Sequence, residues 1–166
     1  MSFAHPSVNE ELISDVLTHM LHEGSGIHGL WHWRRVERNG LFLAAREGGD
    51  AKVVALFALF HDSQRLNDSS DPEHGERGGR LAAEFHATGR LPITLEQLDT
   101  LIEACHRHTD VRHSPAPTIQ CCWDADRLDL TRIGVRPDPA YLNTPTAKGI
   151  AESGDYSEVE AFLTHR

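Results

Sequence analysis

A histidine followed directly by an aspartate, His61-Asp62, ends an apolar stretch of the chain that reads AKVVALFALF. Imidazole nitrogens and carboxylate oxygens are both metal ligands, and neighbouring side chains on a helix point about 100° apart, so both can approach one cation beside the helix. The stretch is too apolar to be a surface, so we expect the pair at the edge of a core. A carboxylate is costly there unless it is paired or bound to a metal.

Further ligands of the same kind lie on both sides of this pair in the sequence. His28 and His32 are four residues apart, which places them on one face of a helix, and His32 stands in the apolar context WHW. Asp124 and Asp126 follow later, in CWDADRLDL. Each pair also has a structural reading: the histidines as core residues, and the aspartates as an acidic helix face paired with nearby arginines.

Length, composition and charge limit the class of protein. The chain has 166 residues, 39% of them hydrophobic and 25% charged, which suits one soluble globular domain. No apolar run approaches the roughly 18 residues that span a bilayer, and the N-terminus has no signal-peptide pattern, so we expect a cytoplasmic protein. A net charge of -9 argues against binding to nucleic acid or to an anionic membrane. The three cysteines form no pattern of a disulfide framework or a zinc finger, and we expect buried thiols.

The elements that must position these residues are predicted to be helices almost throughout. Apolar residues recur at spacings of three and four, and no useful β-alternation is present, so the sequence predicts an all-α bundle of about six to seven helices. Asp50 and Thr94 are expected N-caps, the latter within a capping box, and Ser7 and Ser157 are further candidates. The expected helices cover residues 8–21, 28–46, 51–60, 72–87, 95–108, 119–132 and 158–165, with residues 134–147 as extended coil.

Together His32, His61, Asp62 and Asp126 form an ordered series, H…HD…D, spread over three predicted helices. In this the sequence resembles the HD-domain superfamily of metal-dependent phosphohydrolases, and the resemblance is carried by HWRRVERNG, LFHD and DADRLD. It implies that these four residues bind a metal, with Asp126 rather than Asp124 as the last ligand. It also implies a single HD-like domain over residues 1–166, with a motif-bearing core at about 26–130 and a C-terminal extension, 131–166, packed on it.

The ligand types indicate the metal. Two imidazoles and two carboxylates without a thiolate suit Mn²⁺, Fe²⁺, Co²⁺ or Ni²⁺ better than Zn²⁺, and Mg²⁺ is also acceptable. A metal in such a site acidifies a bound water and polarises a phosphoryl oxygen. The resemblance therefore implies hydrolysis of a nucleotide or another small phosphoester or pyrophosphate.

Two more histidines bear on the number of metal ions. His74 lies in DPEHGERGG, twelve residues after Asp62, and His108 lies in EACHRHTD with His106 nearby. Binuclear branches of the superfamily have histidines at similar places, so His74 and His108 are candidate ligands of a second ion. The alternatives are that His74 contacts substrate or transfers a proton, and that His106 and His108 only complete the C-terminus of a helix.

Two arginines are candidates for binding a substrate phosphate. Arg65 lies three residues after Asp62, and Arg77 lies about one helical turn after His74. Guanidinium groups match the geometry of phosphate. For each arginine the alternative is an ion pair with a neighbouring acidic residue, namely Asp68, Glu73 or Glu76.

Three classes of function follow. The first is a metal-dependent phosphohydrolase that acts on a small phosphorylated substrate. The second is a di-iron oxygenase on the same helical frame, as some binuclear relatives are, and the third is a regulatory domain that binds a nucleotide without turnover. No nucleic-acid or membrane partner is expected, and a homodimer is compatible with all three.

Overall fold

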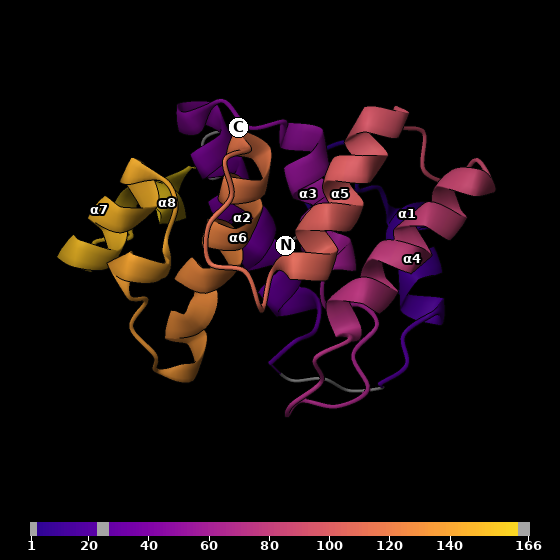
Figure 1. Ribbon diagram of the computed structural model, residues 1–166, viewed down its shortest axis with the longest axis horizontal. Coiled ribbons are helices and arrows are strands. Elements are labelled where there is room, and N and C mark those ends of the chain that lie inside the picture. Colours follow the sequence, from indigo (N-terminus) through magenta and orange to yellow (C-terminus); the bar gives the residue numbers. More distant parts are fainter. Residues whose placement is uncertain (1–2, 23–26, 163–166) are drawn as a thin grey trace.

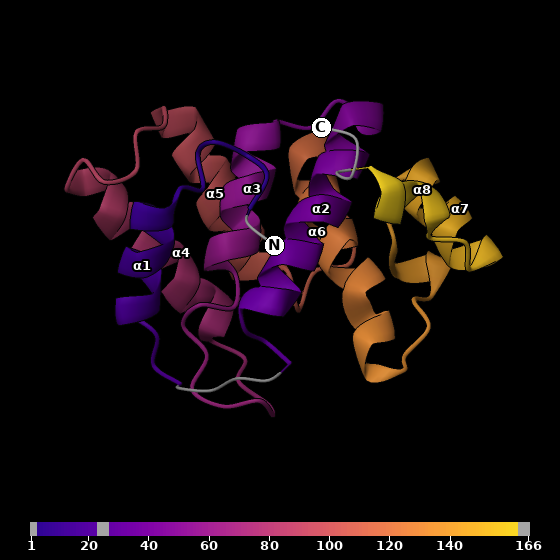
Figure 2. The same cartoon turned by 180° about the vertical axis from the view of Figure 1, so that it is seen from behind.

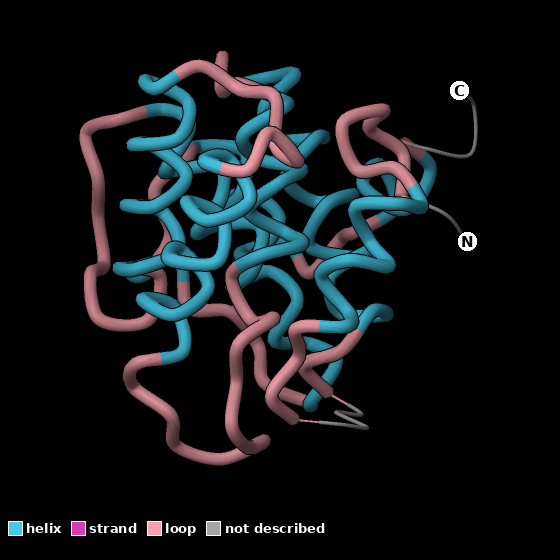
Figure 3. Tube along the Cα trace, turned by 90° about the vertical axis from the view of Figure 1, so that its right-hand side faces the viewer, coloured by secondary structure: helices cyan, strands magenta, loops and turns pink. Residues whose placement is uncertain are grey.

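The computed structural model describes residues 3–22 and 27–162, and all regular secondary structure within them is helical (Figure 3). The described ranges contain eight α-helices and two 3₁₀ helices (Figure 1). In chain order these are α1 (Glu10–Thr18), α2 (Leu30–Glu47), α3 (Ala51–Phe60), α4 (His74–Ala87), α5 (Leu95–Arg107), α6 (Pro117–Leu128), η1 (Asp129–Ile133), η2 (Pro139–Tyr141), α7 (Pro145–Ser153) and α8 (Ser157–Ala161). The all-α prediction is confirmed.

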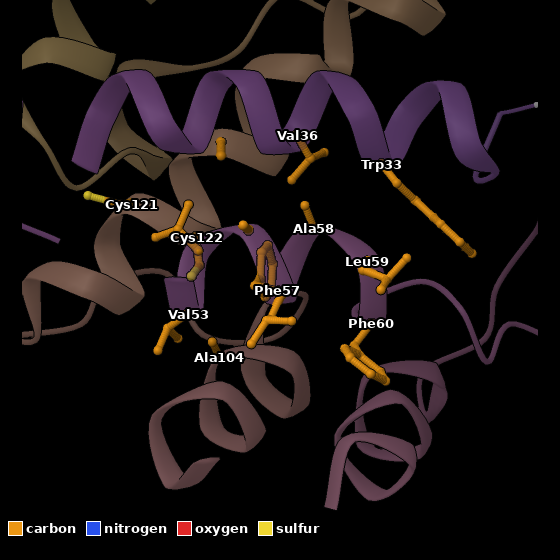
Figure 4. Packing of buried hydrophobic residues seen from close by; sticks show 14 of the residues in the cluster. Trp33, Val36, Val53, Phe57, Ala58, Leu59, Phe60, Ala104, Cys121 and Cys122 are labelled. Carbon is orange, nitrogen blue, oxygen red and sulfur yellow. The ribbon is translucent and has the colours of Figure 1, made fainter. Parts of the chain in front are cut away.

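Helix α3 is the centre of the fold. Its residues 53–60 are all buried, which explains why its sequence is apolar on every side rather than on one stripe. Asp50 caps the helix by accepting hydrogen bonds from the backbone N–H groups of Lys52 and Val53. Helices α2, α5 and α6 pack against α3, and Figure 4 shows Trp33 and Val36 of α2 pointing toward it. No helix in the described part of the chain is both long and apolar enough to cross a membrane.

The other helices cover the two ends of this central group. Helices α1 and α4 lie at one end, and α7 and α8 at the other (Figure 1). Helix α4 packs closely on α5 because glycines face the contact. A Cβ atom on Gly75 would overlap the carbonyl oxygen of Cys105, and one on Gly78 would overlap that of Phe60. The segment HGERGG therefore brings His74 close to both α3 and α5.

Four predicted helix starts were wrong by two residues: those expected at residues 8, 28, 72 and 119 lie at Glu10, Leu30, His74 and Pro117. Helix α1 begins after Asn9, whose side chain accepts from the backbone N–H of Leu12, so Asn9 and not Ser7 is the cap. Helix α4 begins at His74 rather than at Pro72. Asp71 does not cap it, because its carboxylate is bound by the backbone N–H of Leu66 and by the guanidinium of Arg77.

The region expected to be extended coil, residues 134–147, contains the 3₁₀ helix η2 and the start of a helix, α7, that the periodicity did not reveal. Helix α7 starts at Pro145 after the cap Thr144 and ends at Gly154, which has φ = 72°. The last helix, α8, spans only Ser157–Ala161, with Tyr156 at the N-cap position instead of Ser157. The rest of the predicted final helix, residues 163–165, lies outside the described residues. Helices α7 and α8 pack against α2, so the C-terminal segment covers the same helix that carries His32.

Candidate metal centre

Four side chains from three separate parts of the chain converge at the end of α3. The Nε2 atom of His32 lies 3.1 Å from Nε2 of His61, 3.3 Å from Oδ1 of Asp126 and 3.5 Å from Oδ2 of Asp62. Nε2 of His61 lies 3.7 Å from each of the same two carboxylate oxygens. Ligand atoms about 2.1 Å from one metal ion are about 3 to 3.5 Å apart, so these separations match a shared cation. We call these four residues the primary cluster.

The histidines of the primary cluster are oriented by hydrogen bonds at their other ring nitrogen. Nδ1 of His61 donates to the carbonyl oxygens of Phe57 and Ala58, one turn back in α3, at 3.1 Å each. Nδ1 of His32 donates to Oδ2 of Asp129 at 2.7 Å. Such bonds fix the tautomer, so that Nε2 is left as the ligand atom, and a carboxylate partner also makes the imidazole more basic.

A second cluster shares Asp62 with the first. Oδ1 of Asp62 lies 3.0 Å from Nε2 of His74 and 3.8 Å from Nε2 of His108, and these two nitrogens are 3.0 Å apart. Nδ1 of His108 donates to the Cys105 carbonyl oxygen at 2.7 Å, and Nδ1 of His74 donates to that of Asp71. Asp62 therefore presents one oxygen to each cluster.

In each cluster the Nε2 atoms of two histidines face each other, and this arrangement shows whether the residues fit a cation. A carbonyl oxygen only accepts hydrogen bonds, so Nδ1 of His61, His74 and His108 must carry the proton, and the Nε2 atom of each neutral ring has a lone pair. In the second cluster two such lone pairs face each other across 3.0 Å. That arrangement is repulsive unless a proton or a metal ion lies between the nitrogens. The donor set of both clusters therefore suits cation binding.

The charges of the primary cluster favour ionised carboxylates. Burial raises the pKa of Asp62 and Asp126, but the neighbouring histidines outweigh burial and hold both pKa values well below the usual value. Burial lowers the pKa of His32, yet its hydrogen bonds to Asp126, Asp129 and Asp62 raise it to about 10. Without a metal, His32 therefore keeps a proton in the site that a metal ion must displace.

The primary cluster reaches solvent through Asp126. The Asp126 side chain is 22% exposed, whereas those of His32, His61 and Asp62 are between 0% and 4% exposed. The His28 side chain is 15% exposed, and its Nδ1 lies 2.8 Å from Oδ2 of Asp62. Asp126 is therefore the most exposed member of the primary cluster.

Of the two arginines expected to bind a substrate phosphate, only one lies at the clusters. Nη1 of Arg65 lies 3.5 Å from Oδ1 of Asp62 and 3.2 Å from Nε2 of His74, so Arg65 borders the second cluster. Arg77 does not face either cluster. Its Nη2 atom binds both carboxylate oxygens of Asp71, and its Nε donates to the Gln64 carbonyl oxygen. The expectation that Arg77 contacts phosphate is corrected: it stabilises the loop before α4, with Asp71 rather than the expected acidic residues as its main partner.

The structure also shows which of two histidines, His106 or His108, and which of two aspartates, Asp124 or Asp126, face the clusters. His108 is buried in the second cluster, whereas His106 is exposed. Asp124 is fully buried away from the cluster, where its carboxylate accepts from the backbone N–H groups of Asn143 and Thr144 and from both of their side chains. Asp124 thus holds the start of α7, and Asp126 is the aspartate that faces the histidines.

Asp129 is the residue that sequence reasoning missed. Besides His32, it accepts a hydrogen bond from Nε of Arg35 at 2.7 Å, so it links the primary cluster to a second residue of α2. The spacing could have indicated this role, because Asp129 follows Asp126 by three residues and so lies on nearly the same helical face. The expectation that His28 and His32 share one helical face is wrong, because α2 begins at Leu30 and His28 lies in the turn before it, from which it reaches Asp62.

Comparison with known proteins gives one close structural likeness. No protein-family model and no curated protein matches the chain. The crystal structure of a predicted HD superfamily hydrolase from an uncultured Thermotogales bacterium superimposes with a TM-score of 0.67 and 26% sequence identity. The match covers 94% of this chain and 90% of that one. With its all-helical architecture and this likeness over nearly its full length, the protein has the HD-domain fold.

Proposed function

We propose that the protein is a metal-dependent phosphohydrolase whose primary cluster binds a divalent transition metal. The observation that carries the proposal is the convergence of Nε2 of His32, Nε2 of His61, Oδ2 of Asp62 and Oδ1 of Asp126 within 3.1 to 3.7 Å for the measured pairs. The description of the Thermotogales protein as a predicted hydrolase supports the same class of reaction.

The donor atoms favour Mn²⁺, Fe²⁺, Co²⁺ or Ni²⁺ over Zn²⁺, with Mg²⁺ acceptable, because the cluster has imidazole and carboxylate ligands only. Burial, and then the charge of Asp62, raise the pKa of the Cys105 thiol, and among the described residues its sulfur belongs to none of the groups of ligand atoms close enough to share an ion. When bound, such an ion acidifies a water and polarises a phosphoryl oxygen.

The protein's own residues supply the remaining requirements. Asp129 orients His32, and the backbone of α3 orients His61, so the ligands are held in place before a metal binds. Asp126 is the most exposed of the four ligands, and we expect a substrate oxygen to reach the ion beside it. His28 is partly exposed and lies within 2.8 Å of Asp62, where it can bind or orient a phosphate oxygen.

We further propose that the second cluster takes a second ion, and that this ion binds more weakly than the first. Asp62, His74 and His108 provide three ligand atoms. Arg65, however, brings a positive charge to 3.2 Å from Nε2 of His74, and like charges this close oppose each other. Where one ion is bound, His74 and Arg65 are instead available to a substrate phosphate.

The substrate class is a small phosphorylated molecule, with nucleotides as the first to be tested. The net charge of -9 disfavours a long polyanion such as nucleic acid. A bound cation reverses the local field, so a single phosphate group can still be attracted to the carboxylate-rich site.

The decisive experiment combines metal analysis with phosphate release. The purified protein, stripped and reloaded with Mn²⁺ or Co²⁺, is expected to hold at least one tightly bound ion and to release phosphate from a member of a panel of mono-, di-, tri- and cyclic nucleotides. Asp62→Ala should abolish metal binding, because both clusters lose a ligand, and the helical circular dichroism should be kept. Asp99→Ala, on the exposed side of α5, is the matched control. Wild-type metal content in the Asp62 variant would refute the site.

A di-iron oxygenase is the second candidate, because the shared carboxylate of Asp62 between two histidine pairs suits two iron ions equally well. It predicts two irons per chain and oxygen consumption that depends on substrate. Nucleotide binding at full metal loading without any turnover would instead indicate a regulatory domain. Phosphate release without oxygen uptake would exclude both.

A further inference from the structure

A cavity of about 810 Å³ lies on the outer face of α2, away from both clusters. Trp31, Arg34, Arg38, Leu41 and Ala45 line it from α2, three or four residues apart, and so form one helical stripe. Phe3 to Pro6 and the residues Glu160 and Phe162 form its walls, and Figure 2 shows α2 in front of α6 on this side of the molecule. Its volume is in the range of small-molecule pockets.

The lining of this cavity is largely apolar and aromatic. Phe3, Trp31, Leu41 and Phe162 contribute the large apolar groups, and Trp31 is 60% exposed. An exposed tryptophan beside other apolar groups is typical of a binding surface rather than of an ordinary solvated face. The guanidinium of Arg34 lies 5.4 Å from the Trp31 ring centre and 5.9 Å from that of Phe3, so apolar and cationic groups adjoin.

Two arginines that line the cavity have hydrogen-bond donors without an acceptor. The Nε atoms of Arg34 and Arg38 are buried and have no hydrogen-bond partner within the described residues. No ion pair joins either guanidinium to a carboxylate in residues 3–22 or 27–162, whereas the neighbouring Arg35 is bound to Asp129. A buried donor without an acceptor is costly, and it marks guanidinium groups whose hydrogen-bonding capacity is not used up within the described residues.

The acidic residues at the cavity do not neutralise these arginines at hydrogen-bond distance. Both carboxylate oxygens of Glu37 accept backbone N–H groups, from Ala4 at 2.8 Å and from His5 at 2.9 Å. Glu160 lies at the rim on α8 and is exposed to solvent. An anion can therefore approach Arg34 and Arg38 without displacing an existing ion pair.

We propose that this cavity binds a small amphipathic anion, with its carboxylate or phosphate head on Arg34 and Arg38 and its apolar body against Trp31 and Leu41. The site is separate from the proposed hydrolase centre and does not depend on it. His32 projects from the opposite side of α2, and no residue of either cluster lines the cavity. A charge-assisted contact to two guanidinium groups gives such a site its preference for anions.

The test uses decanoate as the probe, and binding is followed by intrinsic tryptophan fluorescence, to which the exposed Trp31 contributes, and by calorimetry on the full chain. Decanoate is expected to bind saturably at one site per chain, and decyltrimethylammonium, which has the same tail and the opposite charge, at least tenfold more weakly. Arg38→Gln and Arg34→Gln, made separately, should each weaken decanoate at least tenfold. Ala45→Trp should fill the cavity and block it.

Arg80→Gln is the matched control, because Arg80 is an exposed arginine on α4 far from this cavity and paired with Glu76. Circular dichroism establishes that each variant is folded. Equal binding of the two detergent-like probes, no saturable binding, or undiminished affinity in both arginine variants would overturn the proposal. Because metal content is not a readout, the result is independent of the hydrolase assignment.

Discussion

The guanidinium of Arg65 borders the imidazole of His74, with Nη1 3.2 Å from Nε2, the atom that faces the second cluster. Arg65 is held there by its own loop, because Nε donates to the carbonyl oxygen of Asn67 and Nη2 to that of Ser69. A fixed positive charge beside one of two neighbouring clusters makes them unequal for cations. The consequence for metal stoichiometry can be measured directly.

We expect Arg65→Gln to strengthen binding of a second ion by about tenfold or more. Two unit charges about 4 Å apart interact by about 1 kcal/mol in water and about 4 kcal/mol near a protein surface, so removing one has a large effect. Calorimetric titration with Mn²⁺ should show two widely separated affinities in the wild type and closer ones in the variant. Arg65→Lys keeps the charge and should keep the separation; closer affinities in that variant would point to loop disorder instead.

Asp129→Asn is expected to lower metal affinity about 10- to 100-fold, the usual cost of removing a carboxylate that orients a ligating histidine. The amide keeps the size of the side chain but loses the charge that supports Nδ1–H of His32 across 2.7 Å. The measurement is the dissociation constant for Mn²⁺, by calorimetry. Asp155→Asn, on the exposed turn before α8, serves as control, and equal affinities in the two variants would contradict the role of Asp129.

Metal binding should release about one proton per chain at neutral pH. His32 has a pKa of about 10 in the metal-free site, so its proton must leave before Nε2 can act as a ligand. Metal affinity should therefore rise with pH up to about 10. Calorimetry in buffers with different ionisation enthalpies counts the released protons, and an affinity that does not change between pH 6 and 9 would argue against His32 as a ligand.

The same raised pKa affects the stability of the metal-free protein with a definite sign. The folded state binds the His32 proton more tightly than the unfolded chain, whose histidine has a pKa of about 6.5. The contribution is thus complete below pH 6.5 and is lost as the pH rises through 10. Urea unfolding of the chelator-treated protein should show a lower free energy of unfolding at pH 9 than at pH 6.5, and His32→Gln should reduce that difference.

Gly75→Ala is expected to destabilise the fold by about 1 to 3 kcal/mol, as overpacking of a close contact does. The added Cβ would overlap the carbonyl oxygen of Cys105 and press on the imidazole of His108 at 3.0 Å. Urea unfolding measures the loss, and the second ion should also bind more weakly. Gly149→Ala, in α7 with no atom near the added methyl group, should be neutral or slightly stabilising; a similar loss there would show that packing at α5 is not the cause.

Local chemistry allowed much of the fold to be predicted from the sequence. Asp50 caps α3, Thr94 and Gln97 form the expected capping box, and the apolar run before His61 is the buried central helix. These features depend on neighbours within a few residues, which the sequence displays. Helix α7 was missed because its start is held by Asp124, 20 residues before Thr144 in the chain, and not by a strong apolar period of its own.

The sequence by itself determined the ligand types of the candidate site, because a histidine next to an aspartate at the end of an apolar helix, with His32 and Asp126 on other helices, already specifies nitrogen and oxygen donors. Only the tertiary structure decided which of the neighbouring candidates face that site. In the structure Asp126 faces the histidines, whereas Asp124 faces α7. His108 rather than His106 lies in the second cluster. Arg77 is bound to Asp71, and Asp129 accepts a hydrogen bond from His32. The physical reason is that a side chain's direction is set by helix rotation and by partners distant in the chain, and residue spacing alone contains neither.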